Sequence, residues 1–281
     1  MAEPAAALEA DATLGDLLRY WRRVRTMSQL DLASAAMTTP RHMSFIETGR
    51  SKPSREMVLR LAGALDVPLR DRNGLLLAAG YAPLYAERAL DHPALDRVNA
   101  AISGMLAEHE PLPAVVMDRG WNLLRVNAGA QRLFSGLFAP EAVPASANVL
   151  RVILEPGPVR SRIMNWRELA PALLERARRE AVGGILDLAT AELVQELRSR
   201  PDVESVLGAP RAVAPPTPVI DVHVEYAATE LRFFSVVSTI GTPVDVTAQE
   251  LRVEAFFPAD DATAERWLTL ARDGIIRVTR S

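Results

Sequence analysis

Apolar residues recur at helical spacing through the first eighty residues, in short runs separated by turn signals. The first run reads LGDLLRYWRRV, with leucines and a tryptophan on one helical face and arginines on the other, which is typical of an amphipathic helix. Further helices are expected to begin after the N-cap residues Ser28, Thr39 and Ser54, whose hydroxyl groups can accept hydrogen bonds from the first turn. A fifth is expected over residues 72–79. The pattern therefore predicts an all-α bundle of five helices over residues 13–80.

The pattern changes after a proline-containing junction at residues 81–93. One long helix is expected over residues 94–109, helical segments dominate residues 128–207, and a closing helix is expected over residues 261–273. Elsewhere the pattern predicts strands, and apolar and polar residues alternate most clearly over residues 220–226 and 251–257. These strands are expected at residues 114–118, 121–127, 220–226, 231–240 and 251–257.

The five expected strands predict an antiparallel sheet. Arg119-Gly120 lies between the first two strands and is a two-residue hairpin signal. The strand over residues 231–240 is apolar on both faces and is therefore expected to be central, whereas Arg252 and Glu254 alternate with apolar residues in the last strand. We expect a multi-domain protein in which the helical bundle is followed by an α+β domain over residues 94–273.

The composition is that of an ordinary globular protein of about two domains, with 281 residues, 49% of them hydrophobic and 24% charged. There is no cysteine, which excludes disulfides, Cys-ligated metal sites and thiol nucleophiles. The longest uncharged run, residues 73–86, is shorter than the roughly 18 residues that a membrane span requires. The acidic N-terminus lacks a signal pattern. These observations predict a soluble, cytoplasmic protein.

Charge is distributed unequally between the two predicted domains. Residues 13–80 contain eleven Arg and Lys residues against six Asp and Glu, a net charge of +5. Residues 81–281 contain 21 basic residues against 26 acidic ones, a net charge of −5. The whole-chain pI of about 5.9 would argue against nucleic acid as a partner, but a basic module joined to an acidic one favours it.

Residues 28–54 have the spacing of a helix-turn-helix, which is a short helix, a turn of three to four residues, and a second helix that can enter the major groove of DNA. Met43 and Ile46 of the second helix are expected to face the first helix. The residues left to point outward are Arg41, His42, Ser44 and Phe45. The free N–H groups at a helix N-terminus also attract phosphate.

The motif SQLDLA, followed by a short turn and then FIETGRSKPS, resembles the XRE-type (phage-repressor-like) helix-turn-helix. In the turn, Met37 stands where that family usually has glycine. The resemblance implies that Gln29 meets a phosphate and that Arg50 and Lys52 contact the DNA backbone. Glu47 is expected to brace the bundle, because phosphates repel a carboxylate. The predicted DNA-binding residues are Gln29, Thr39, Pro40, Arg41, His42, Ser44, Phe45, Arg50 and Lys52.

Three further stretches, LLLAAGYAP, HEPLPAVVMDRGWNLLRVN and Asn165-Trp166, resemble the MmyB-like subgroup of these regulators. This resemblance implies that the second domain is PAS-like and binds a small apolar effector, such as a fatty-acyl compound. PAS-like sheets curve around a ligand cavity, and large apolar side chains are expected to line it. The pocket candidates are Trp121, Phe134, Phe138, Trp166, Phe233 and Phe234.

Enzymatic chemistry finds little support in the sequence. The four histidines are scattered, and no GxSxG, GxGxxG or P-loop motif is present. Asp221, His223 and Glu225 share one strand face and could hold a metal ion, but a solvated polar face is far commoner. Neither catalysis, nor a metal, nor a required cofactor is therefore expected.

Two features keep alternative interpretations open. The arginines of the first helix (Arg19, Arg22 and Arg23) form either a solvated face or phosphate contacts. The helical domain could also bind a partner protein, as an antitoxin-like or sigma-factor-binding regulator would, but its basic residues count against that. The favoured function is a sequence-specific transcription regulator that binds double-stranded DNA as a homodimer, because half-sites are read about 34–36 Å apart.

Overall fold

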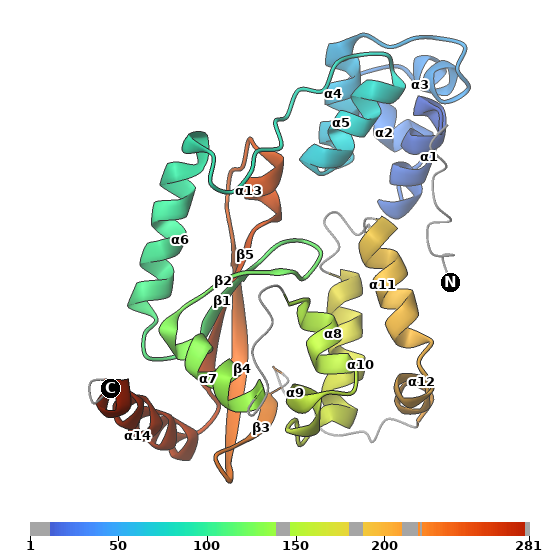
Figure 1. The fold of residues 1–281 in the computed structure, drawn as a ribbon. Coiled ribbons are helices and arrows are strands. Elements are labelled where there is room, and N and C mark those ends of the chain that lie inside the picture. Colours follow the sequence, from blue (N-terminus) through green and yellow to red (C-terminus); the bar gives the residue numbers. More distant parts are fainter. Residues whose placement is uncertain (1–11, 139–146, 180–187, 210–218, 220, 279–281) are drawn as a thin grey trace. The chain divides into compact units, whose positions relative to one another are not determined.

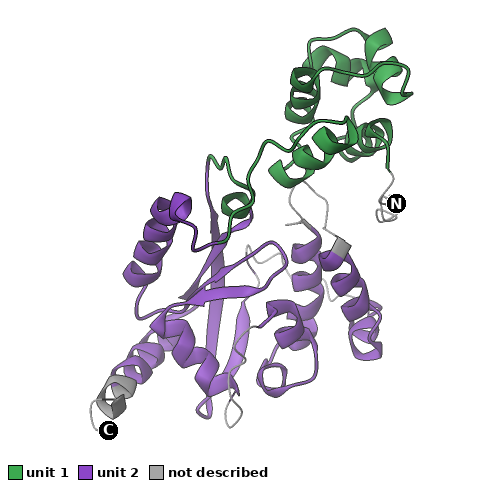
Figure 2. Cartoon of the chain, turned by 45° about the horizontal axis from the view of Figure 1, so that its top comes forward, with its two compact units in different colours: residues 1–89, 180–185, 242–249 green, residues 90–179, 186–241, 250–281 purple. Residues whose placement is uncertain are grey.

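The computed structural model describes residues 12–138, 147–179, 188–209, 219 and 221–278, and these residues divide into two compact units (Figure 2). Of the described residues, 12–89 and 242–249 form the first unit, which we call the head. The other described residues, from 90 to 278, form the second unit, which we call the sheet domain. No helix in the described part of the chain is long and apolar enough to cross a membrane.

Five short helices make up most of the head. They are α1 (Leu14–Val24), α2 (Gln29–Ala35), α3 (Pro40–Glu47), α4 (Arg55–Ala64) and α5 (Leu69–Ala78) (Figure 1). The predicted caps are confirmed, because the hydroxyls of Ser28, Thr39 and Ser54 each accept a backbone N–H three residues further on. Helix α5 begins three residues earlier than predicted, since Pro68 fixes an extended entry (φ −61°, ψ 156°) directly before Leu69.

The core of the head takes one apolar face from each helix. Its fully buried side chains include Leu18, Leu32, Met43, Leu61 and Leu75. The turn between α2 and α3 contains Met37 in the left-handed conformation (φ 52°), with its side chain 77% exposed. Glycine is the usual choice at such a helix end, so this turn keeps its geometry at an energetic cost.

The sheet domain contains most of the remaining elements (Figure 1). Its helices are the 3-10 turn η1 (Pro93–Leu95), α6 (Asp96–Glu108), α7 (Ala128–Phe138), α8 (Val149–Leu154), α9 (Pro158–Ser161), α10 (Trp166–Arg179), α11 (Leu188–Arg198), α12 (Pro201–Leu207) and α14 (Asp261–Val278). Its strands are β1 (Ala114–Met117), β2 (Leu123–Val126), β3 (Val222–Tyr226), β4 (Thr229–Thr239) and β5 (Arg252–Pro258). They form one antiparallel sheet in the order β2-β1-β5-β4-β3. Helix α13 (Val246–Glu250) lies between β4 and β5 in the chain.

Helices lie on both faces of this sheet (Figure 1). On one face, Ile102 and Leu106 of α6 pack with Val116 and Val253. On the other face, α7, α8 and α10 contribute to larger cores that include Val115 and Met117 of β1. The predicted fold class, an all-α bundle with an α+β domain built on a five-stranded antiparallel sheet, is therefore confirmed.

The hairpin between β1 and β2 differs from its prediction. Met117 pairs with Leu123, so five residues rather than two connect the strands. Within this connection Trp121 is left-handed (φ 66°), and its side chain is 1% exposed. A buried aromatic side chain therefore anchors this connection, and local turn residues do not reveal such an anchor.

β4, which was expected to be central, is an interior strand that pairs with β5 on one side and with β3 on the other, and the middle strand of the five is β5. Arg252 and Glu254 of β5 are buried, with 6% and 4% exposure. A charge can be buried when it is paired, and Glu254 is paired with Arg176. Smaller differences are that η1 replaces the first turn of the predicted helix 94–109 and that α14 extends to Val278. Ile220, expected in a strand, lies outside the described residues.

Candidate nucleic-acid interface

Helix α3 has one buried face and one exposed face. Met43 and Ile46 are buried in the core of the head, as predicted. On the opposite side Arg41 is exposed, and Ser44 and Phe45 are partly exposed. The guanidinium carbon of Arg41 lies 5.4 Å from the centroid of the Phe45 ring, which is a cation–π distance. The helix thus presents a short cationic and aromatic surface to solvent.

The start of α3 is fixed by hydrogen bonds of the preceding turn. Thr39 Oγ1 accepts the backbone N–H of His42 at 3.1 Å, and Pro40 occupies the first helical position. The His42 ring lies beside the same turn, with Nδ1 3.1 Å from Thr38 Oγ1. These contacts fix the first turn of α3, whose free N–H groups carry the positive end of the helix dipole.

Glu47, the last residue of α3, is held inside the head by two partners. Its carboxylate accepts hydrogen bonds from Arg22 Nε at 2.9 Å and from Gln29 Nε2 at 2.6 Å. The Glu47 side chain is 1% exposed, in agreement with its predicted bracing role. This bond uses one of the two N–H donors of the Gln29 amide, so a phosphate at the start of α2 can be bound by the other donor and by backbone N–H groups.

The arginines of α1 do not form the single solvated or phosphate-binding face that was considered. Arg19 donates to the backbone carbonyl of Glu47 and to Asp16 Oδ1. Arg22 donates to Met27 O in addition to the Glu47 carboxylate. Both side chains therefore connect α1 to other parts of the head, while Arg23 is exposed.

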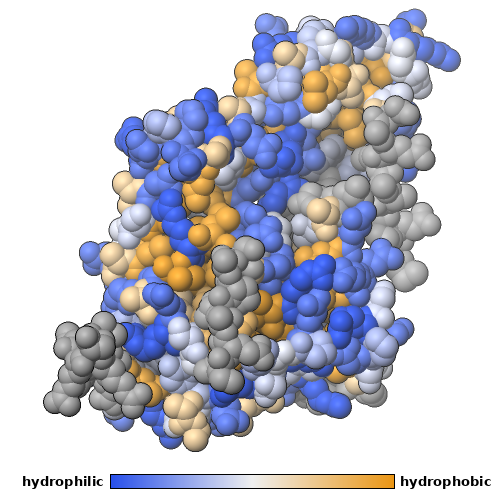
Figure 3. Space-filling view, viewed as in Figure 1, coloured by the Kyte–Doolittle hydropathy of each residue, from blue (hydrophilic) through white to orange (hydrophobic). Residues whose placement is uncertain are grey.

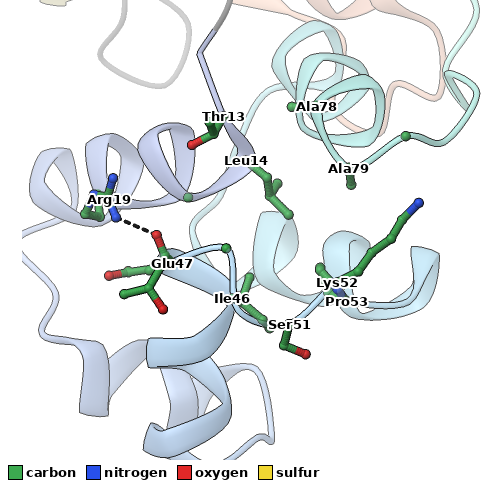
Figure 4. A pocket seen from close by; sticks show the side chains of 14 residues that line it. Thr13, Leu14, Arg19, Ile46, Glu47, Ser51, Lys52, Pro53, Ala78 and Ala79 are labelled. Carbon is green, nitrogen blue, oxygen red and sulfur yellow. Dashed lines mark hydrogen bonds between the residues drawn. The ribbon is translucent and has the colours of Figure 1, made fainter.

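The loop after α3 carries two exposed cations, Arg50 and Lys52. Gly49 ends the helix with φ 72°. Lys52 Nζ lies 5.2 Å from the centroid of the Tyr81 ring, and Tyr81 Oη donates to Pro53 O at 2.9 Å. An open groove of about 710 Å³ runs beside this loop, and Figure 4 shows Arg19 and Lys52 on opposite sides of it. The aromatic contact holds the Lys52 side chain beside Tyr81, which follows the end of α5.

The polar residues considered for a metal on β3 do not form such a site. His223 Nε2 is 3.9 Å from Asp221 Oδ2, and its Nδ1 is 3.7 Å from Glu230 Oε1. Among the residues that the structure describes, no group of three His, Asp or Glu side chains could hold a metal ion.

In the sheet domain, five of the six pocket candidates lie in two neighbouring apolar cores. Trp121 belongs to one core, and Phe138 and Phe233 belong to the other. Phe134 and Trp166 are partly buried and pack against both. The sixth candidate, Phe234, neighbours Phe233 in β4 and so points to the opposite face of the sheet, where it stacks on Phe257 at 5.6 Å. Figure 3 shows apolar residues at the surface of the sheet domain, among polar ones.

A buried ion pair beside these cores was missed by the sequence analysis. Arg176 Nη1 is 2.7 Å from Glu254 Oε1, and the Arg176 guanidinium carbon lies 5.0 Å from the centroid of the Trp121 ring. The two charges are 78 residues apart in sequence. Because Arg252 and Glu254 alternate with apolar residues, the sequence indicated a polar face on β5. The sequence does not show that α10, which carries Arg176, covers this face.

Comparison with known families agrees with this architecture. Residues 98–270 match the MmyB-like transcription regulator ligand binding domain, and residues 18–71 match the helix-turn-helix family. No curated protein matches the chain. The first family match covers more than half of the 281 residues. The chain therefore belongs to the MmyB-like transcription regulators and joins an XRE-type DNA-binding helix-turn-helix to a ligand-binding domain.

Proposed function

We propose that this regulator binds double-stranded DNA sequence-specifically as a homodimer, with α3 in the major groove, and that a small apolar molecule is its effector. The observation that carries the proposal is the exposed face of α3, where Arg41 and Phe45 lie opposite the buried Met43 and Ile46. A helix with one face fixed in a core and one cationic face outward suits groove binding.

The proposed contacts divide into base-reading and backbone-binding sets. Arg41 at the exposed start of α3 reads a base edge, because a guanidinium can bond two acceptors of guanine. Phe45 presses on a thymine methyl group, and Ser44 and His42 complete the reading face. The remaining contacts bind phosphates and fix the position of the helix; they come from Arg50, Lys52, Gln29 and the backbone N–H groups in the first turns of α2 and α3, while Thr39 and Pro40 lie at the groove-facing start of α3.

The proposed effector site lies where the two cores of the sheet domain meet. The apolar side chains that pack against both cores are Phe134, Ile153, Trp166 and Phe256, and each is only partly buried. Partly exposed aromatic side chains between two cores favour an apolar ligand of fatty-acyl character. Ligand changes DNA binding by favouring one conformation of the regulator over another.

Two substitutions separate the proposed DNA roles. Arg41→Ala is expected to lower affinity for a selected duplex by about 1–3 kcal/mol and to relax base preference. Lys52→Ala is expected to weaken binding to all duplexes alike and to reduce the salt dependence by about one charge. Fluorescence anisotropy on selected and random duplexes at several salt concentrations measures both, with the exposed Arg97→Ala in the sheet domain as the matched control. Identical behaviour of the two variants on both duplexes would contradict the assignment.

Native mass spectrometry tests the homodimer and the effector in one measurement. We expect the mass of two chains together with a retained apolar small molecule. A chain that is monomeric at micromolar concentration, both alone and with a duplex containing two half-sites, would overturn the homodimer. A chain that neither retains nor binds any apolar compound would overturn the effector class.

A further inference from the structure

We propose that residues 242–249 are a docking element through which the ligand-binding domain controls the stability of helix α5 in the DNA-binding head. These residues connect β4 with β5 of the sheet, yet by their contacts they belong to the head (Figure 2). The inference rests on the proposed ligand response of the domain, but its test involves neither DNA nor ligand.

The first contact of this docking element completes α5. The residue before α5 is Pro68, which makes no side-chain cap hydrogen bond. Instead, the side-chain carbonyl oxygen Oε1 of Gln249, in the docking element, accepts the backbone N–H of Leu69 at 2.8 Å. The first N–H groups of a helix lack partners within the helix, so an external acceptor stabilises its first turn. A residue 180 positions away thus supplies the cap that α5 lacks.

A second set of contacts holds the docking element to residues 86–88 of the head. The Asp245 carboxylate, 5% exposed, forms an ion pair of 2.7 Å with Arg88 Nη1. The backbone N–H of Val246 donates to Ala86 O at 2.9 Å, and Thr247 Oγ1 donates to Arg88 O at 2.6 Å. These two hydrogen bonds and the ion pair, together with the Gln249 cap, therefore oppose local detachment of the segment.

The docking element is also continuous with the middle of the sheet. Gln249 precedes Arg252, the first residue of β5, by only three positions. Between them Glu250 is paired with Arg119 of the β1–β2 connection at 2.8 Å. A change in the pairing or position of β5 therefore acts on residues 245–249 through a short covalent link. Since α5 packs in the head core, the same change alters the stability of the head.

Hydrogen exchange by mass spectrometry on the full chain tests the cap. Gln249→Ala is expected to make the α5 amides exchange about fivefold faster, the effect of losing one capping hydrogen bond. Gln131→Ala is the matched control, because Gln131 is exposed on α7 and lies outside the docking element. Unchanged exchange of α5 in Gln249→Ala would overturn the proposal.

A perturbation of the sheet tests the coupling itself. Val253→Ala removes two methyl groups from β5, and Arg119→Gln removes an ionic partner of Glu250 without altering the apolar core. In the otherwise unchanged protein, either substitution is expected to make the α5 amides exchange faster. In a chain that also carries Gln249→Ala, the logarithm of that acceleration is expected to be at most half as large. An equal effect in both backgrounds, or no effect of Arg119→Gln on α5, would show that residues 242–249 do not transmit the change.

Discussion

Gln29 Nε2 lies 2.6 Å from the carboxylate of Glu47, so the start of α2 is bonded to the last residue of α3. Arg22 of α1 reaches the same carboxylate at 2.9 Å, and three helices therefore meet at one buried acid. The orientation of α3 relative to α1 and α2 depends on this junction. Substitution of Glu47 is therefore expected to change the free energy of unfolding of the head, which can be measured without DNA.

Glu47→Ala is expected to destabilise the head by about 3 kcal/mol, because donors of Arg22 and Gln29 lose their acceptor in a largely buried site. Urea unfolding followed by circular dichroism measures the change. Glu56→Ala, at an exposed position of α4, is the matched control and should cost no more than about 0.5 kcal/mol. Equal effects of the two substitutions would contradict the bracing role.

Met37→Gly is expected to stabilise the head by about 0.5–1 kcal/mol. Met37 has φ 52°, a conformation that is unfavourable for a residue with Cβ, and its exposed side chain gives up little packing when removed. Thermal unfolding of the full chain measures this as a higher Tm of the head. Ser34→Gly, at an exposed position inside α2, should instead lower the Tm. A lower Tm for Met37→Gly would show that the Met37 side chain stabilises the turn.

The capping box of α2 predicts a pH dependence. Hydrogen bonds from the Ser28 hydroxyl, and then from the Ser28 N–H, hold the pKa of Asp31 below its ordinary value of 3.8. A carboxyl group whose pKa is lowered by folding contributes stability above pH 3.8, and that stability is lost as the pH falls through the lowered value.

Ser28→Ala is expected to raise the pKa of Asp31 towards 3.8 in a carboxyl NMR titration. Asp260 is the internal control, because its pKa is lowered by hydrogen bonds with Thr263, in the other unit. A pKa of Asp31 that is unaffected by Ser28→Ala would show that the Ser28 hydroxyl does not lower it.

The ion pair between Arg176 and Glu254 predicts strong non-additivity. Arg176→Leu alone is expected to cost about 3 kcal/mol, because it leaves the Glu254 carboxylate buried without this partner. Arg176→Leu combined with Glu254→Leu should cost less than the sum of the two single changes. A double-mutant cycle by urea unfolding measures the coupling, and additive effects would contradict a direct interaction.

The sequence predicts best what depends on neighbouring residues. Ser28, Thr39 and Ser54 indicate their helices because a cap and its partner are three positions apart. The partners of Glu254 and Gln249 could not be predicted from neighbouring residues. The partner of Glu254 is in α10 and that of Gln249 is in α5, and both pairs form only after the chain has folded back on itself.

The same distinction applies to the candidate site. The buried and exposed faces of α3 follow from its helical period, so Met43 and Ile46 were assigned correctly. The hydrogen bonds of Arg19 and Arg22 with Glu47 were not predicted. The sequence pattern of arginines on one helical face is the same whether their side chains contact water or groups of another helix. The five-residue hairpin connection was missed because its anchor, Trp121, is held by distant core residues.

The location of residues 242–249 has a consequence for synthesis of the protein. Helices α1 to α5 leave the ribosome within the first eighty residues, but the cap of α5 is translated 180 residues after Leu69. At a synthesis rate of about 5–20 residues per second, roughly ten to forty seconds pass between the synthesis of Leu69 and that of Gln249, which caps α5. A nascent or truncated chain that ends before Gln249 therefore has a helical head in which the first turn of α5 lacks this cap.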